Sequence, residues 1–257
     1  MLDFAVQIAR EAGQVLADKF GRALQISNKG DIDLVTEADL AAERLIVERI
    51  RSYHPRHAIL TEESGDVKEA GGPQAEYKWI IDPLDGTTNY AHGYPTFCVS
   101  VALEHEGRVV VGAVYDPTRD EMFAAERGAG ATLNGRRLRV SETDELNRAL
   151  VCTGFPYDVR ERGDFARHFR AFIMQAQSVR RDGAAALDHA YVAAGRFEVF
   201  YEEGLRPWDV AAGVLLVEEA GGRVTHYDGS AFSIYASHIA ASNGLVHQAT
   251  LRVLQQS

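Results

Sequence analysis

Two carboxylates and two hydroxyls lie close together in residues 79–90, which read WIIDPLDGTTNY. An apolar run ends at Asp82, Asp85 follows three residues later, and Gly86 then precedes two threonines. Like charges a few ångströms apart repel, so the pair needs a shared proton, an arginine that approaches in space, or a metal ion. Mg²⁺ prefers oxygen ligands such as carboxylates and substrate phosphate. Two such ions can hold the attacking and leaving oxygens of a displacement at phosphorus.

The neighbouring residues of this motif suit the same chemistry. Gly86 lets the backbone approach a ligand closely, and the amides of the Gly86-Thr87-Thr88 turn can bind phosphate if a helix starts there. Thr87 can hydrogen-bond an attacking water, and the carbonyl of Leu84 is a candidate extra metal ligand. The structural alternative is a surface turn whose acids cap local amides. The apolar strand in front of the motif favours the functional interpretation.

Three further acids occur where predicted elements begin or end. Glu62 follows a short strand-like run, Asp39 begins a helix in a capping-box pattern with Thr36, and Asp209 begins another helix after Pro207. Each has an ordinary explanation, either as a solvated loop residue or as an acid at the positive end of a helix. Their joint presence favours a shared metal site.

The first half of the chain supplies two helices and an antiparallel sheet. Apolar spacing predicts a helix from Leu2 to Phe20 and a second one that starts after Thr36 and ends before Pro55. A meander follows, in which Asn134-Gly135 marks a tight hairpin. Its predicted strands are Phe97–Glu104, Val109–Asp116, Met122–Glu126 and Arg137–Val140.

The second half alternates strands and helices. The predicted strands are Leu150–Gly154, Phe197–Tyr201, a strand at Val224 and one at Ala240–Ser242, and the predicted helices are Phe165–Gln177, Ala184–Ala194, a helix from Pro207 to Gly221 and Val246–Leu254. We interpret residues 1–257 as a single catalytic unit. Residues 1–145 would form an N-terminal α+β subdomain with the antiparallel sheet and the metal motif. Residues 146–257 would form a C-terminal α/β subdomain with the substrate pocket.

Composition restricts the possible partners. The 257 residues carry 37 acids against 27 bases, a formal net charge of −10, without a lysine or arginine run, so nucleic-acid binding is disfavoured. The N-terminus lacks the apolar core of a signal peptide, and no window approaches the ~18 apolar residues of a membrane span. We expect a cytoplasmic enzyme without a membrane partner. Cys98 and Cys152 are expected to be buried, reduced core thiols rather than a disulfide or a metal site.

On these motifs the sequence resembles the inositol monophosphatase family of metal-dependent, lithium-sensitive phosphatases. The resemblance covers nearly the whole chain. Its two signatures are WIIDPLDGTTNYAH at 79–92 and WDVAAGVLLVEEAGG at 208–222, and the segments DLVTEAD at 33–39, TEES at 61–64 and GAAALDHAYVAAGR at 183–196 follow the family order. It implies an α/β (α+β) fold, the layered αβαβα sandwich of the inositol monophosphatase and fructose-1,6-bisphosphatase type, and a homodimer.

The resemblance also implies roles for individual residues. Two to three Mg²⁺ ions would bind each subunit: Glu62, Asp82 and the Leu84 carbonyl would hold the first, Asp82, Asp85 and Asp209 the second, and a weaker third would lie near Glu62. Thr87 and Glu62 would orient the attacking water, with Asp39 hydrogen-bonded behind Thr87.

The rest of the implied site binds substrate. The amides of Gly86 and Thr87 would bind the phosphate, and the substrate-binding set as a whole comprises Glu62, Leu84, Asp85, Gly86, Thr87, Gly183, Ala184, Ala185, Glu202 and Asp209. Among these, Glu202 and Asp209 would reach the hydroxyls of the alcohol. The implied reaction is in-line attack of metal-activated water on an inositol monophosphate or a similar polyol phosphate, without a phosphoenzyme.

Four positions need comment. Val199 stands where bacterial members more often carry a small residue, and we interpret it as strand packing. Ala184 replaces the serine or threonine of many relatives. Glu202 and Glu203 compete for the substrate-facing role, and the spacing from Asp209 selects Glu202. Arg180-Arg181 is interpreted as an exposed charge pair, although it could steer an anionic substrate.

Three alternatives remain open. An aspartyl-phosphate phosphatase would use its first acid as a nucleophile, but its acids are two residues apart rather than three. The same chemistry could act on fructose 1,6-bisphosphate, histidinol phosphate, NADP or nucleoside phosphosulfate-type substrates. A protein of another class could keep the fold as a non-catalytic scaffold or regulatory homologue.

Overall fold

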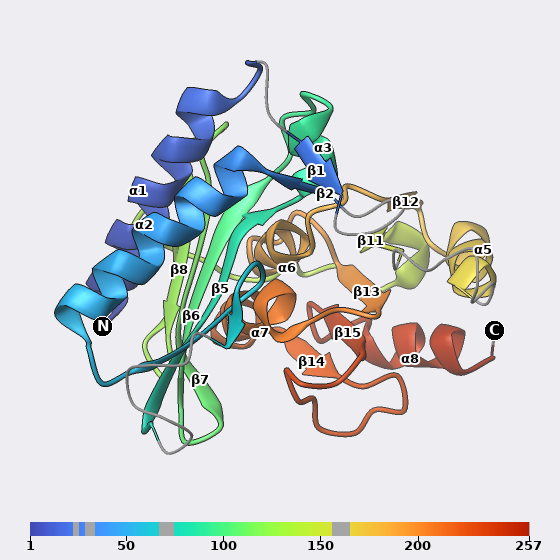
Figure 1. Ribbon diagram of the computed structural model, residues 1–257. Coiled ribbons are helices and arrows are strands. Elements are labelled where there is room, and N and C mark those ends of the chain that lie inside the picture. The colour runs from blue at the N-terminus through green and yellow to red at the C-terminus, as the bar shows by residue number, and fades with distance from the viewer. Residues whose placement is uncertain (23–25, 29–33, 67–74, 156–164, 257) are drawn as a thin grey trace.

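Five layers of secondary structure make up the fold (Figure 1). The computed structural model describes residues 1–22, 26–28, 34–66, 75–155 and 165–256, so Asp33 of the DLVTEAD segment lies outside the described residues. A pair of helices covers a large sheet, a second pair lies between this sheet and a smaller one, and a third pair covers the smaller sheet. The predicted αβαβα sandwich is confirmed.

The outer helices of the first layer are α1 (Leu2–Lys19) and α2 (Glu37–Tyr53). The α2 helix begins with the predicted capping box: Thr36 Oγ1 accepts a hydrogen bond from the Ala38 amide at 3.1 Å, and the Thr36 amide donates to Asp39 Oδ2 at 2.9 Å. These bonds satisfy helix-terminal groups that have no partner within the helix. The capping box fixes where Asp39 lies.

The large sheet has the strand order β10-β9-β8-β7-β6-β5-β3-β4. Its members are β3 (Ala58–Thr61), β4 (Gly65–Asp66), β5 (Tyr77–Asp85), β6 (Cys98–His105), β7 (Arg108–Asp116), β8 (Glu121–Glu126), β9 (Gly130–Leu133) and β10 (Arg136–Arg137). All neighbouring strands are antiparallel except β3 and β5. Asn134 and Gly135, both with positive φ, turn the chain between β9 and β10 as predicted.

Two predictions about this sheet need correction. The predicted strand Arg137–Val140 is wrong in extent, because β10 ends at Arg137 and the Val140 amide donates to the Ala220 carbonyl at the end of a helix. The strand that carries the acidic motif does not stop at Asp82. It continues to Asp85 with a register shift, since Asp82 pairs with Ser100 and Asp85 with Cys98. The extra residue between the acids forms a bulge, which re-aims side chains locally.

The central helices are α6 (Ala185–Ala193) and α7 (Pro207–Glu219). Both are apolar on nearly all sides because both lie between sheets. Close approach needs a small residue: a Cβ added to Gly112 of β7 would lie 2.9 Å from the Ala212 carbonyl oxygen of α7. This contact brings the start of α7 to the edge of the large sheet.

The smaller sheet has the order β12-β11-β13-β15-β14. Its members are β11 (Leu150–Thr153), β12 (Ser178–Arg180), β13 (Val199–Glu203), β14 (Arg223–Thr225) and β15 (His238–Ser242), and α5 (Phe165–Gln175) and α8 (His247–Gln256) cover its outer face. The described chain also contains the β1–β2 pair (Ile26–Asn28, Leu34–Thr36), α3 (Thr87–Ala91) and the 3₁₀ turn η2 (Leu146–Arg148).

The sheets divide the sequence cleanly. The strands of the large sheet end at Arg137 and those of the smaller one begin at Leu150, while the proposed division at residue 145 stays an interpretation. The strand predicted at 197–201 runs instead from Val199 to Glu203, which puts both glutamates in β13. Val199 is buried in the core against α5 and α8, consistent with a packing role. Within the described segments, every helix is too short or too polar to cross a bilayer.

Candidate active site

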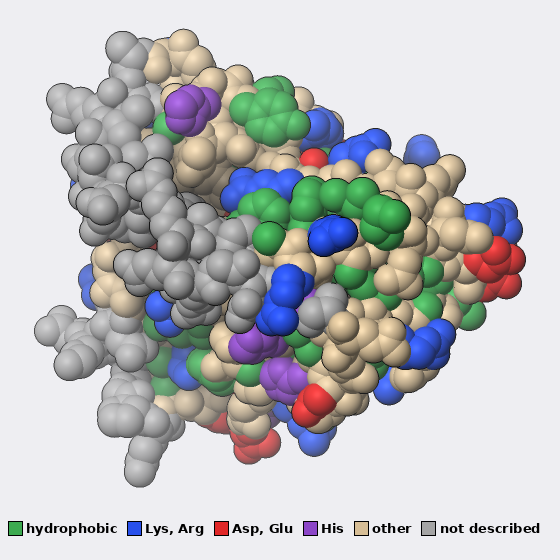
Figure 2. Space-filling view, turned by 90° about the vertical axis from the view of Figure 1, so that its right-hand side faces the viewer, with side chains coloured by type: hydrophobic (Ala, Val, Ile, Leu, Met, Phe, Trp, Pro, Cys, Tyr) green, Lys and Arg blue, Asp and Glu red, His purple; other side chains and the backbone are tan. Residues whose placement is uncertain are grey.

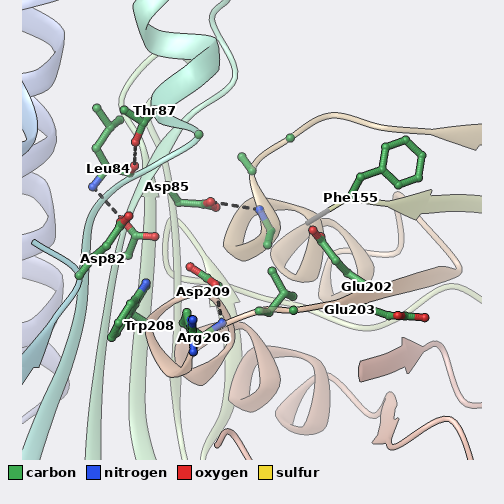
Figure 3. A pocket seen from close by; sticks show the side chains of 18 of the residues that line it. Asp82, Leu84, Asp85, Thr87, Phe155, Glu202, Glu203, Arg206, Trp208 and Asp209 are labelled. Atoms are coloured by element: carbon green, nitrogen blue, oxygen red, sulfur yellow. Dashed lines mark hydrogen bonds between the residues drawn. The ribbon is translucent and has the colours of Figure 1, made fainter. Parts of the chain in front are cut away.

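A cavity of about 480 Å³ lies where the end of β5, the starts of α3, α6 and α7, and the end of β13 meet (Figure 3). Every predicted site residue except Asp39 lines it. The lining residues are Glu62, Asp82, Leu84, Asp85, Gly86, Thr87, Gly154, Phe155, Arg181, Gly183, Ala184, Ala185, Glu202, Glu203, Gly204, Leu205, Arg206, Trp208 and Asp209.

Asp85 is held from across the cavity. Its Oδ2 accepts a hydrogen bond from the Ala186 amide at 2.8 Å, and its Oδ1 accepts one from the Ala185 amide at 3.2 Å. These amides belong to the first turn of α6, whose unsatisfied N–H groups favour an anion. The Cys98 thiol adds a weaker contact at 3.5 Å to Asp85 Oδ2. The acid therefore joins the large sheet to α6.

Two other acids are each held by a backbone donor close to them in sequence. Asp82 Oδ1 accepts from the Leu84 amide at 3.0 Å, across the bulge of β5. Asp209 Oδ2 accepts from the Arg206 amide at 2.6 Å in the first turn of α7, which Pro207 opens as predicted. Figure 3 shows both carboxyl groups directed into the cavity from opposite walls.

Thr87 begins α3 and connects the cavity to Asp39. The Thr87 hydroxyl lies 3.2 Å from Asp39 Oδ1 and 3.0 Å from the Leu84 carbonyl oxygen. The other Asp39 oxygen accepts hydrogen bonds from both the amide and the hydroxyl of Thr36. Asp39 therefore both caps α2 and contacts the threonine beside the acids.

A glycine is required at position 86 because of its backbone conformation and its close protein neighbours, whereas the sequence suggested a close approach to a ligand. Its φ of 91° is left-handed, and an added Cβ would lie 2.9 Å from the Thr96 carbonyl oxygen and 3.3 Å from the Ala184 side chain. Both effects oppose a side chain. The close approach at this position is to the protein itself, although the residue also lines the cavity.

Burial dominates the electrostatics of the site. It raises the pKa of Asp82 well above its usual range, and the charges of Glu62, Asp85 and Asp209 raise it further. Burial likewise raises the pKa of Asp209, the pKa of Asp85 to about 6 and that of Glu202 to about 8. A charged acid in such a place needs a cation or a proton.

Arginines offer limited compensation. Arg181 lines the cavity and lowers the pKa of Glu202, while Arg180 is exposed and bonds to Ser178. Both arginines are exposed, as interpreted from the sequence, and Arg181 also forms part of the cavity wall. For Asp82 and Asp209, hydrogen bonds from the backbone N–H groups of Leu84 and Arg206 lower the pKa and so oppose the effect of burial.

The donor set fits a hard divalent cation. Four carboxylates and the Leu84 carbonyl present only oxygen atoms to the cavity, the ligand type that Mg²⁺ takes. Within the described ranges, no three of the carboxylates Glu62, Asp82, Asp85 and Asp209 bring oxygens within 4.8 Å of one another. An ion held by three of these carboxylates would therefore require the side chains to draw together.

A second group was not predicted from the sequence. Cys152, Asp182 and Asp188 bring ligand-type atoms within 4.8 Å of one another. Burial raises the pKa of the Cys152 thiol and that of Asp188, the Asp188 charge raises the thiol pKa further, and a hydrogen bond with Cys152 opposes the rise at Asp188. Burial therefore favours the protonated, neutral form of both groups. Cys98 and Cys152 are both free and buried, as predicted.

Glu202 and Glu203 occupy different surroundings. Both line the cavity, but Glu203 also lies 3.3 Å from His168 Nδ1 and 3.7 Å from His238 Nε2, whereas Glu202 is 8% exposed. Figure 3 shows the two carboxyl groups pointing apart. The geometry agrees with the choice of Glu202, whose role stays a prediction.

Comparisons with known proteins agree with these motifs. The chain matches the Inositol monophosphatase family over residues 1–257. It is 46% identical over 260 residues to "Nus factor SuhB" of Pseudomonas aeruginosa, covering 99% of the chain and 96% of the relative. It is 42% identical over 259 residues to the "Inositol-1-monophosphatase" of Mesorhizobium japonicum, covering 100% and 96%. The solved inositol monophosphatase from Anabaena superposes with a TM-score of 0.90 at 47% identity, covering 99% and 95%.

The raised acid pKa values predict how stability depends on pH. Because these acids bind protons more tightly in the folded state, the free energy of unfolding falls as pH rises from the unfolded values near 4 through about 6 for Asp85 and about 8 for Glu202. In EDTA, Tm should drop by several degrees between about pH 5 and about pH 8, at about 2–4 °C per kcal/mol. Mg²⁺ should remove most of that drop, as measured by thermal melts.

Asp82→Asn provides the control for this prediction. It lacks one acid with a raised pKa and one expected ligand, so both its pH slope and its stabilisation by Mg²⁺ should be smaller than in the wild type. Equal slopes, or equal stabilisation of both proteins by Mg²⁺, would contradict the proposed electrostatic role.

Proposed function

The chain belongs to the inositol monophosphatase family, and from that premise we propose that it hydrolyses a small phosphate monoester in a Mg²⁺-dependent reaction. An inositol monophosphate or a similar polyol phosphate is the substrate class. The observation that carries the proposal is the convergence on one cavity of four acids from three separate segments, the end of β3, β5 and the start of α7. A phosphate dianion could enter such a cavity only with compensating positive charge.

The proposed ligands follow from the resemblance and from the cavity wall. Glu62, Asp82 and the Leu84 carbonyl would hold one Mg²⁺, and Asp82, Asp85 and Asp209 a second, with a third near Glu62. When bound, the ions supply positive charge to the phosphoryl oxygens and make water a better nucleophile near neutral pH. The count of two to three ions is part of the proposal.

The protein's own groups orient the reactants. Asp39 accepts the hydrogen bond of the Thr87 hydroxyl, which leaves the lone pairs of that oxygen available to accept a hydrogen bond from an attacking water. Glu62 provides a second acceptor at the same end of the cavity. Fixed acceptors on both sides would hold the water in line with the scissile bond. The Gly86 and Thr87 amides, at the start of α3, would bind the phosphate.

The alcohol part of the substrate would lie against the opposite wall. Gly183, Ala184 and Ala185 provide a small-residue surface, and Glu202 and Asp209 offer groups for hydroxyls. With a pKa of about 8, Glu202 carries a proton near neutral pH and can donate as well as accept a hydrogen bond. Fructose 1,6-bisphosphate, histidinol phosphate and NADP remain alternative substrates for the same chemistry.

Asp82→Asn should lower kcat/KM with Mg²⁺ by at least about 10²-fold, the scale seen when a transition-state stabiliser is removed. The matched control is Glu198→Gln, which changes a buried acid outside the cavity that accepts from the Leu150 amide. It should retain activity. Phosphate release is measured on a panel of the esters named above.

Two results would contradict this assignment. Wild-type turnover by Asp82→Asn would show that the acid is not required. Trapping of a phosphorylated aspartate on the wild-type protein would favour the aspartyl-phosphate alternative, whereas lithium inhibition without such an intermediate supports the proposal.

The names of several relatives favour a second candidate. Proteins of Pseudomonas aeruginosa and Escherichia coli that are 46% and 45% identical to this chain are called Nus factors. By analogy, we propose as the alternative that this chain acts as a non-catalytic component of an assembly, with the fold as a scaffold. The net charge of −10 argues for a protein partner over direct nucleic-acid binding.

Complementation separates the two candidates. The gene is placed in a Pseudomonas aeruginosa strain that lacks its own Nus factor SuhB, and the defects that the wild-type chain corrects are scored. If assembly is the function, Asp82→Asn should correct them equally well. Failure of this variant at wild-type protein levels would assign the role to catalysis.

The homodimer implied by the resemblance is a further part of the proposal, as is the cytoplasmic location. The α5 helix exposes Ile173 and Met174, which are 53% and 77% exposed. Figure 2 looks onto the side of the molecule where α5 lies, and hydrophobic side chains gather there beside basic ones. We propose this surface as a subunit contact.

Replacing Ile173 and Met174 with glutamate should convert a dimer into a monomer, because a buried contact cannot accommodate two unpaired charges. Sedimentation equilibrium gives the mass. Leu40→Glu, at an exposed position on α2, is the control and should leave the mass unchanged. A wild-type mass for the double variant would place the contact elsewhere.

A further inference from the structure

Gly154 lies directly against the carboxyl group of Glu202. It follows the last residue of β11, and β11 runs parallel to β13, with Thr153 paired to Tyr201. A Cβ added to Gly154 would lie 2.1 Å from Glu202 Oε2, 2.2 Å from Oε1 and 2.3 Å from Cδ. The three nearest atoms all belong to this one carboxyl group, and both residues line the cavity.

Backbone conformation does not account for the glycine. Gly154 is absent from the residues with positive φ, so an L-amino acid can adopt its backbone geometry. The missing side chain provides room for the Glu202 carboxyl group. An alanine here would be compatible with the fold, because only the end of one flexible side chain must move.

Glu202 cannot make that adjustment through its backbone. It lies within β13, paired with Ile239 of β15, and the next residue, Glu203, is held by His168 and His238. A methyl group at 154 would therefore rotate the Glu202 side chain away from its place on the cavity wall. The phosphate end of the cavity, formed by the end of β5 and the start of α3, would be unaffected.

We propose that Gly154 is a positioning residue: by leaving room for the Glu202 carboxyl group, it gives the cavity its preference for esters whose alcohol carries several hydroxyls. The inference rests on the proposed phosphatase function. Gly154 acts through Glu202 and makes no contact of its own with the reacting atoms.

Two substrates separate positioning from a merely structural role. Gly154→Ala should raise KM for inositol 1-phosphate about 10-fold or more, the scale of one lost hydrogen bond to a charged or strongly polar group. The value of kcat/KM for phenyl phosphate, whose alcohol lacks further hydroxyls, should stay within about twofold of wild type, since the phosphate end is intact. A similar loss on both substrates would overturn the proposal.

A mutant cycle tests whether the effect passes through Glu202. In a Glu202→Ala background the added methyl has no carboxyl group to displace, so Gly154→Ala should cause no further loss on inositol 1-phosphate. Glu202→Asp, one methylene shorter, should partly restore KM in the Gly154→Ala protein. Additive losses in the cycle, or no rescue, would overturn the proposal.

The outcomes also separate this inference from the proposed function. If the function is wrong, the wild-type protein hydrolyses neither ester. If the function is right and the inference wrong, the wild type hydrolyses both and Gly154→Ala does not discriminate between them. Thermal melts of each variant confirm that the fold is retained.

Discussion

The mutual repulsion of buried carboxyl groups is the constraint on which this structure depends. Asp82, Asp85 and Asp209 all lose water, and each raises the cost of charging another. Asp82 and Asp85 both come from β5, where a bulge separates them, and Asp209 comes from the start of α7. Each of the three carboxyl groups accepts a hydrogen bond from a backbone N–H. In such surroundings an acid can be charged only with a source of positive charge beside it.

The layered architecture has a direct consequence for this arrangement. The large sheet ends in the acids of β5, and the two central helices begin at the same place. The N-terminal amides of α6 donate to Asp85 of the sheet, and the amide before α7 donates to Asp209 of that helix. Close packing of α7 against the large sheet, as where Gly112 meets Ala212, holds the helix in its position relative to the sheet. Packing energy in the core thus offsets the electrostatic cost at the cavity.

Local features were predictable from sequence, and contacts between distant segments were not. The hydrophobic period indicates the helices and strands themselves. Their boundaries follow from local signals: Thr36 starts α2, Asn134-Gly135 forms the turn between β9 and β10, and Pro207 starts α7. The hydrogen bonds of Asp85 to α6 join residues 100 or more positions apart, and the Gly154–Glu202 contact depends on strand order. The place of Arg181 on the cavity wall likewise depends on contacts that its neighbours in sequence do not indicate.

Asp39 caps the N-terminus of α2 through the Thr36 amide and also accepts a hydrogen bond from the Thr87 hydroxyl. Few substitutions can alter one of these contacts and spare the other. An evolving lineage that alters the contact with Thr87 must also rebuild the terminus of α2. Asp39 should therefore change only together with compensating partners, which slows divergence at this corner of the molecule.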